Sequence, residues 1–151
     1  MNPDHALLLD FVRRGAREPT VFGSNPLACA LGTTLLAADA ERGIVRLGFE
    51  PDARFVQGNG AVQGGIVAAM LDFATAFAVL LQLPLERSAV TATLDLQLLR
   101  AATAGRFIAQ GNVRRLGRTF AFASAELLGE GDDRLIAVAS AALPLVNARS
   151  D

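Results

Sequence analysis

The feature that most constrains the fold of this 151-residue chain is a long apolar segment from Gly64 to Gln82. Loop signals bound it at Gly58-Asn59-Gly60 and at Pro84, and Asp72 is its only ionisable residue. A helix that is apolar on all sides must be covered by protein or by lipid. The segment is long enough to cross a bilayer, but an ionised Asp72 would be costly there and no basic cluster marks a cytoplasmic flank. We therefore predict a helix over about 64–82, buried inside a folded protein.

The sequence on either side of this helix predicts β-strands. Apolar and polar residues alternate with a period of two, which is typical of a sheet with one covered face. Short loops at about 39–43 and 129–133 predict hairpins. Five strand segments follow from this pattern, at about 33–38, 43–50, 90–99, 106–114 and 119–128, and a sixth at about 135–145. The economical arrangement is a curved antiparallel sheet around one central helix, an α+β fold in a single domain over 1–151.

The N-terminal region predicts a short amphipathic helix over about 4–15. Asp4 is placed to cap it, and Leu7, Leu8, Phe11 and Val12 form its apolar stripe. A loop is expected to follow, through about residue 26.

Composition excludes several classes of function. The formal net charge is -1, so no strongly basic field exists to gather nucleic acid. Cys29 is the only cysteine and His5 the only histidine, which excludes an intrachain disulfide and makes a zinc cluster or a His-dependent mechanism poorly supported. We expect Cys29 to be a small buried apolar residue. No phosphate-loop or dinucleotide motif is present, so no cofactor is expected.

Hydrophobic residues make up 52% of the chain, which favours a large buried interface or contact with lipid. The first residues lack the basic region and apolar core of a secretory signal, so the cytoplasm is the expected compartment.

The start of the predicted central helix offers a group of backbone donors. The first N–H groups of a helix have no intrahelical acceptor and carry partial positive charge. Gly64 and Gly65 would let a ligand approach them closely, and a carbonyl placed there would be stabilised as its oxygen becomes an oxyanion. The structural alternative is that the two glycines allow tight packing of helix on sheet.

Asp72 is the second chemical feature of the segment. A carboxylate in apolar surroundings costs several kcal/mol unless it is paired or solvated. It either serves structure, satisfied by a hydroxyl or an arginine, or faces a cleft as nucleophile or general base. Asp72 lies eight positions after Gly64, about 12 Å along a helix axis. If both act on one carbonyl, Asp72 must come from a second chain, and the protein is at least a dimer.

Three motifs resemble the hot-dog-fold acyl-CoA thioesterases of the phenylacetate-degradation (PaaI-like) type, over about 25–146 of the chain. The first is Gly60-x-x-Gln63-Gly64-Gly65 followed by Asp72, similar to the family's G-x-x-H-G-G with an acidic residue nine positions after the His. The second is the strand-like sequence at 91–102, and the third is Arg115-Leu116-Gly117-Arg118, which resembles an R-x-G-R turn.

The resemblance implies a hot-dog fold and roles for particular residues. Asp72 matches the catalytic carboxylate and Gly64 the oxyanion donor, while Gln57 falls where an Asn or Gln orients substrate or water. The positions expected to contact substrate are Gln63, Gly65, Asn59, Thr91 and Arg118. Thr91 matches a Ser/Thr that assists the water in some members, and Arg118 falls where basic residues often meet the CoA phosphates. The alternative for Arg118 is a solvated turn residue.

Gln63 departs from the family pattern, because it replaces the usual His. Glutamine cannot titrate near neutral pH, although it donates and accepts hydrogen bonds.

Three hypotheses remain open at the level of sequence. The first is an acyl- or aryl-CoA thioesterase, a homodimer or, by family analogy, a homotetramer, with CoA entering only as part of the substrate. The second is a non-catalytic acyl-CoA-binding hot-dog protein, motivated by Gln63. The third is a structural homo-oligomer or small membrane-associated protein, motivated by hydropathy alone; the first two imply neither a membrane nor a nucleic-acid partner.

Overall fold

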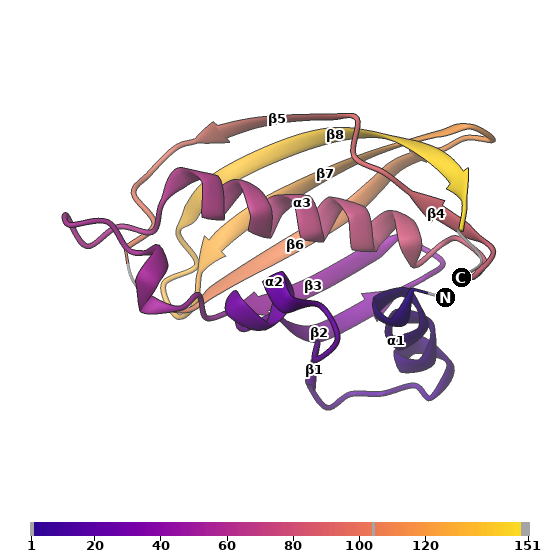
Figure 1. The fold of residues 1–151 in the computed structure, drawn as a ribbon, viewed down its shortest axis with the longest axis horizontal. Helices are drawn as coiled ribbons and strands as arrows, with labels where there is room; N and C mark the ends of the chain where they lie inside the picture. Colours follow the sequence, from indigo (N-terminus) through magenta and orange to yellow (C-terminus); the bar gives the residue numbers. More distant parts are fainter. Residues whose placement is uncertain (1, 104, 149–151) are drawn as a thin grey trace.

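The computed structural model describes residues 2–103 and 105–148, and in it a curved antiparallel sheet wraps around one long helix (Figure 1). The predicted α+β hot-dog architecture is confirmed. The four helical segments are α1 (Pro3–Arg13), α2 (Pro26–Ala30), the short 3-10 turn η1 (Ala53–Phe55) and the central α3 (Gly64–Leu80).

The described part of the sheet has eight strands in the order β1-β2-β3-β6-β7-β8-β4, with β5 also paired to β8. The strands are β1 (Thr20–Val21), β2 (Thr34–Asp39), β3 (Ile44–Phe49), β4 (Arg87–Ala89), β5 (Thr93–Leu98), β6 (Phe107–Leu116), β7 (Phe120–Gly129) and β8 (Leu135–Asn147). The long strand β8 carries two partners in succession, because β5 pairs with its first half and β4 with its last residues.

Helix α3 lies across the concave face of the sheet and packs most closely on β6 (Figure 1). The contact is close because β6 has a glycine at its centre: a Cβ built on Gly111 would lie 1.9 Å from the carbonyl oxygen of Ala74. Small residues on the inner face of the next two strands continue the contact, and Ala123 on β7 and Ala139 on β8 are both buried. The apolar sequence of α3 is therefore explained by the sheet on one side and by α1, which also contacts it.

The N-terminal helix is anchored differently from the sequence-based expectation. Asn2, and not Asp4, caps α1, because the Asn2 side chain accepts hydrogen bonds from the backbone N–H groups of Asp4 and His5. The Asp4 carboxylate instead accepts bonds from Ser24 Oγ at 3.0 Å and Asn25 Nδ2 at 2.9 Å. Asp4 is buried, so this tie fixes α1 to the segment that precedes α2.

Four short elements, β1, α2, η1 and β4, and one residue environment differ from the sequence-based prediction. The predicted loop through residue 26 ends in the helix α2, which Asn25 caps and Pro26 begins. The strand predicted over about 90–99 is shorter, because only β5 (Thr93–Leu98) falls within that range, and neither β4, which precedes it, nor η1 was anticipated. Cys29 is exposed rather than buried, and its Sγ donates a hydrogen bond to the carbonyl oxygen of Phe22 at 3.4 Å.

Within the described residues, no helix combines the length and apolarity needed to cross a membrane.

The close approach of α3 to β6 predicts a specific sensitivity to side-chain size. Gly111→Ala should lower the free energy of unfolding by about 3 kcal/mol, because the added methyl group meets backbone that cannot rotate away. Urea unfolding at matched protein concentration measures the loss. The control is Gly48→Ala, whose methyl would meet only a Leu36 side chain at 3.4 Å and should change stability by less than about 1 kcal/mol. Equal stability of the two variants would contradict this account of the helix–sheet contact.

Candidate active site

A hollow of about 390 Å³ opens at the start of α3. Its polar residues include Gln57 and Asn59 from the loop before the helix, and Gly64 from the first helical turn. The segment 98–102, which follows β5, forms the opposite wall. The loop and this wall are joined by backbone bonds, since Val62 N–H donates to the carbonyl of Ala102 at 2.7 Å.

The amide groups at the start of α3 are available to a ligand. Gln63 occupies the N-cap position, but its side chain caps nothing. Its carbonyl accepts the N–H groups of Ile66 and Val67. In residues 2–103 and 105–148, no acceptor bonds to the N–H of Gly64 or Gly65. A Cβ on Gly65 would meet nothing within 4 Å, so the approach to these donors is open.

The loop over 57–61 holds the other predicted residues at the rim. Asn59 Oδ1 accepts the N–H of Ala61, and Gln57 N–H donates to the carbonyl of Ala61 at 2.7 Å. The Asn59 oxygen therefore shapes the loop. Gln57 also lines a second hollow of about 260 Å³, together with Gln63.

Asp72 lies in the middle of α3 and is half-buried, not sealed in the core. Its Oδ1 accepts a hydrogen bond of 2.7 Å from the Thr91 hydroxyl, and Thr91 stands in the link between β4 and β5. This is the neighbouring hydroxyl that a structural role for Asp72 would need. Within the described chain, however, no donor reaches Oδ2 of Asp72, so half of the carboxylate is left for another partner.

The site residues fall into two groups within one chain. Gln57, Asn59 and Gly64 share the hollow at the start of α3, whereas Asp72 and Thr91 meet about two turns further along. Arg118 joins neither group. It lies on the turn between β6 and β7, at the end of the sheet where α3 finishes, and its carbonyl accepts a bond from Arg87 on β4 (Figure 1).

The inner face of the sheet is uncovered beside these groups. Leu94, Leu96 and Leu98 on β5 pair with buried alanines of β8, so their side chains share the inner face. Nevertheless Leu98 is 52% exposed, and Leu94 and Leu96 are only half-buried. In the described chain β5 pairs with β8 alone, so its other edge is open.

His5 has a structural environment. It is 1% exposed, and its Nε2 lies 3.0 Å from the carbonyl oxygen of Leu83, which joins α1 to the segment after α3. Across the described ranges, no three His, Cys, Asp or Glu residues gather in a way that could hold a metal ion.

The far wall of the hollow contains residues that sequence reasoning did not assign to the site. Leu98 contacts the helix start closely enough that a Cβ on Gly64 would lie 3.0 Å from its Cδ1. Arg100 stands at the other end of this wall. The sequence carried one signal, an arginine just after a strongly alternating strand, but its nearness to Gly64 follows only from the path of the chain.

Comparison with known proteins gives the family. The thioesterase superfamily model matches residues 59–136, a range that includes Gly64, Asp72 and Thr91. The chain belongs to the thioesterase superfamily. This member is accordingly a thioester hydrolase, and the predicted likeness to thioesterases of the phenylacetate-degradation type is confirmed.

Solved structures agree with this thioesterase assignment. A phenylacetic acid degradation-related protein from Ralstonia eutropha JMP134 is 31% identical, with a TM-score of 0.78 over 91% of this chain and 98% of that one. A thioesterase family protein from Silicibacter pomeroyi is 25% identical, with a TM-score of 0.77 over 95% and 99%. The PaaI protein of E. coli is 19% identical, with a TM-score of 0.76 over 96% of each chain, and shows the shared fold. No curated protein matches this sequence.

The Thr91–Asp72 contact predicts a measurable coupling in this thioesterase. A double-mutant cycle of Thr91→Val and Asp72→Ala should give about 1 kcal/mol of interaction in the free energy of unfolding, because a hydrogen bond to a charged but half-exposed group is lost. Thr93→Val is the matched control, since Thr93 is exposed on β5 and should show no coupling to Asp72. Equal coupling for the two threonines would show that the contact is not formed.

Proposed function

We propose that this thioesterase hydrolyses the thioester of an acyl- or aryl-CoA to the free acid and CoA, at a site shared between two copies of the chain. Gly64 of one copy would bind the carbonyl oxygen, and Asp72 of the other would act on the carbonyl carbon. The observation that carries this proposal is the pair of half-sites: open amides at the start of α3, and a half-buried carboxylate with one unused oxygen in its middle.

The chemistry follows from these two groups. As nucleophile, the Asp72 carboxylate adds to the carbonyl, the carbon–sulfur bond breaks, CoA leaves as the thiolate, and water cleaves the resulting anhydride. As general base, Asp72 takes a proton from water and the hydroxide adds to the carbonyl; the carbon–sulfur bond then breaks, and CoA leaves as the thiol with the proton that Asp72 took. In both routes negative charge develops on the carbonyl oxygen, where the N–H of Gly64 stabilises it. Thr91 orients Asp72 through Oδ1, and Gln57 is placed to orient substrate or water. Water is the only co-reactant.

The uncovered inner face supports the participation of a second chain. Exposed leucines on an unpaired edge strand are a liability that proteins normally cover. A second copy set antiparallel along β5 would cover them. It would also bring one helix start toward the middle of the other helix, closing the separation of about two turns that one chain cannot close. We propose at least a homodimer for this reason.

A CoA ester is the proposed substrate class. Among proteins of the same fold, a Streptococcus mutans structure contains acetyl-CoA; it is 16% identical, with a TM-score of 0.67 over 77% of this chain and 90% of that one. The helix around Asp72 is apolar in sequence, since Ala69 and Phe73 are partly buried hydrophobic residues on either side of it in α3. An apolar acyl or aryl group suits such a lining.

The alternative is a protein that binds acyl-CoA without hydrolysing it. Gln63 favours it, because the residue at the helix start cannot carry charge. Assays with a panel of acyl- and aryl-CoA esters distinguish the two functions. Release of free thiol supports hydrolysis, whereas tight binding of every ester without thiol release supports the alternative.

The role of Asp72 predicts a large kinetic effect. Asp72→Asn should lower kcat by about 10²–10⁴-fold with little change in thermal stability, because the amide neither attacks nor takes a proton. Free-thiol release from the best ester of the panel measures kcat, and circular dichroism checks the fold. A variant as active as the parent protein would remove Asp72 from the mechanism.

The role of the Gly64 N–H can be tested by removing that one donor. Gly64→Pro deletes the N–H at the first helical position, where proline is well tolerated, and Gln63 before it already has the extended conformation that proline requires. We expect kcat to fall by about 10²–10³-fold. Gly64→Ala is the control, because it adds the same Cβ near Leu98 but keeps the N–H. Equal losses of kcat in the two variants would mean that crowding by the added side chain, and not the missing N–H, causes the effect.

The shared site predicts complementation between inactive chains. A mixed dimer of Asp72→Asn and Gly64→Pro chains contains one site with both native residues and one with neither. Random mixing by co-expression should therefore restore roughly a quarter of the parental activity, since about half of the dimers are mixed and each has one intact site. Separately purified variants, assayed without exchange, should stay inactive. Failure of the mixture to recover activity would place Gly64 and Asp72 in the same chain's site.

A further inference from the structure

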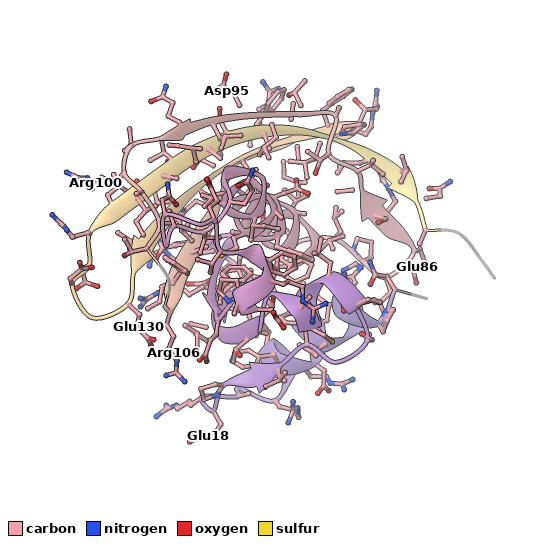
Figure 2. All side chains as sticks on the ribbon, turned by 60° about the vertical axis from the view of Figure 1, so that its left-hand side comes forward. Glu18, Glu86, Asp95, Arg100, Arg106 and Glu130 are labelled. Atoms are coloured by element: carbon pink, nitrogen blue, oxygen red, sulfur yellow. The ribbon has the colours of Figure 1, made fainter. Side chains whose placement is uncertain are left out.

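Another hollow, of about 420 Å³, adjoins the one at Gly64, and three arginines line it. The two hollows share Arg100 and Ala101 as a common wall. Arg106 and Arg134 line the outer one, which the hairpin between β7 and β8 closes from the side. Figure 2 shows Arg100, Arg106 and Glu130 on one side of the molecule, with Glu86 on the opposite side.

Arg100 is fixed in position and retains binding capacity. Its Nη1 donates to the carbonyl of Leu135 at 2.7 Å, which ties the guanidinium to the first residue of β8. A guanidinium has five N–H donors, so most of this fork stays available. Among the described residues, no carboxylate lies within 4.0 Å of it. A fixed, unshared guanidinium between two hollows is suited to an anion that lies across both.

The other two arginines are held by weak ion pairs that an anion can replace. Arg106 lies 3.1 Å from Glu50 and 3.9 Å from Glu130, and Arg134 lies 4.0 Å from Asp132. All these side chains are at least 45% exposed, so the pairs contribute little to stability. The lining carries Arg100, Arg106 and Arg134 with Glu130 and Asp132, and Glu50 approaches Arg106 from just outside it. Among the described residues, Arg100 is therefore the arginine of this lining that no carboxylate neutralises.

We propose that this arginine-lined hollow binds the phosphate groups of the substrate's CoA portion. The thioester and the phosphates lie at opposite ends of CoA, joined by the narrow pantetheine arm. With the carbonyl at Gly64, the arm passes along the segment 98–102 and over Arg100, and the phosphates reach Arg106 and Arg134. Arginine suits this task because its planar fork matches phosphate oxygens two at a time. This inference rests on the proposed function, since it assumes a CoA ester in the Gly64 hollow.

The proposal locates the phosphates away from Arg118. Arg118 lies at the other end of α3 from Gly64 in the same chain, on the turn between β6 and β7 (Figure 1). The family resemblance predicts phosphate binding at Arg118, whereas this inference predicts it at Arg100, Arg106 and Arg134. One binding measurement distinguishes the two.

Binding of adenosine 3′,5′-bisphosphate, measured by calorimetry on the whole protein, tests the site without any catalysis. The Arg100→Ala/Arg134→Ala double variant should bind it at least about tenfold more weakly than the parent, whereas Arg118→Ala should bind within about twofold. Arg134→Glu, a single change at a 69% exposed side chain, should also weaken binding, and Arg17→Glu is its charge-matched control elsewhere on the surface. Any of three results would overturn the proposal. These are parental affinity in both the Arg100→Ala/Arg134→Ala and the Arg134→Glu variants, a loss of affinity confined to Arg118→Ala, or no binding by the parent protein.

Kinetics supply a second readout that separates this inference from the proposed function. The ratio of kcat/KM for an acyl-CoA to that for the same acyl-pantetheine, which lacks the phosphates, should fall at least about tenfold in the double variant. An unchanged ratio would overturn the phosphate site even if hydrolysis is fast. Absence of hydrolysis in the parent protein, together with Arg134-dependent binding of the bisphosphate, would instead refute the proposed function and leave the phosphate site supported.

Discussion

The contact between the backbone of α3 and strand β6 is the constraint on which the rest of the structure depends. Because Gly111 has no side chain, the carbonyl of Ala74 approaches the sheet more closely than any other residue would allow. This approach sets the depth at which the whole helix lies, and so the height of both Gly64 at its start and Asp72 in its middle. If the helix lay further from the sheet by the width of one methyl group, Gly64 would move away from Leu98, and Asp72 would move away from Thr91.

The same depth explains why an acidic residue is tolerated in so apolar a helix. Asp72 faces the side of α3 that the sheet leaves uncovered in one chain, where it is half-buried and receives one hydrogen bond. The desolvation cost of the carboxylate is thereby reduced but not removed. In the proposed reaction this half-buried position would leave Asp72 open to a substrate that a fully buried carboxylate could not reach.

Sequence patterns predicted the elements whose signal is long and periodic. The apolar run from Gly64 predicted α3, and alternation predicted β3 and the inner-facing leucines of β5. The patterns failed where an element is short: β4 has three residues, too few to show a period, and Asn25-Pro26 is a helix start that resembles any polar turn. For the candidate site, sequence reasoning named Gly64 and Asp72, whose roles stay predictions, but it did not name the second wall of the hollow. Leu98 and Arg100 reach the helix start only because β5 pairs with the first half of β8, a long-range pairing that no local pattern encodes.

The link between β4 and β5 has an unusual consequence for how this chain can vary. Both strands pair with β8, so the residues between them, Val90 to Ala92, must span a fixed distance along one continuous partner. Insertion or deletion of one residue there would turn β5 over, sending Leu94 and Leu96 to solvent, and would carry the Thr91 hydroxyl away from the carboxylate. Surface connections usually tolerate changes in length. This one is a spacer of fixed length, and related chains that keep the same chemistry should differ there by substitution only.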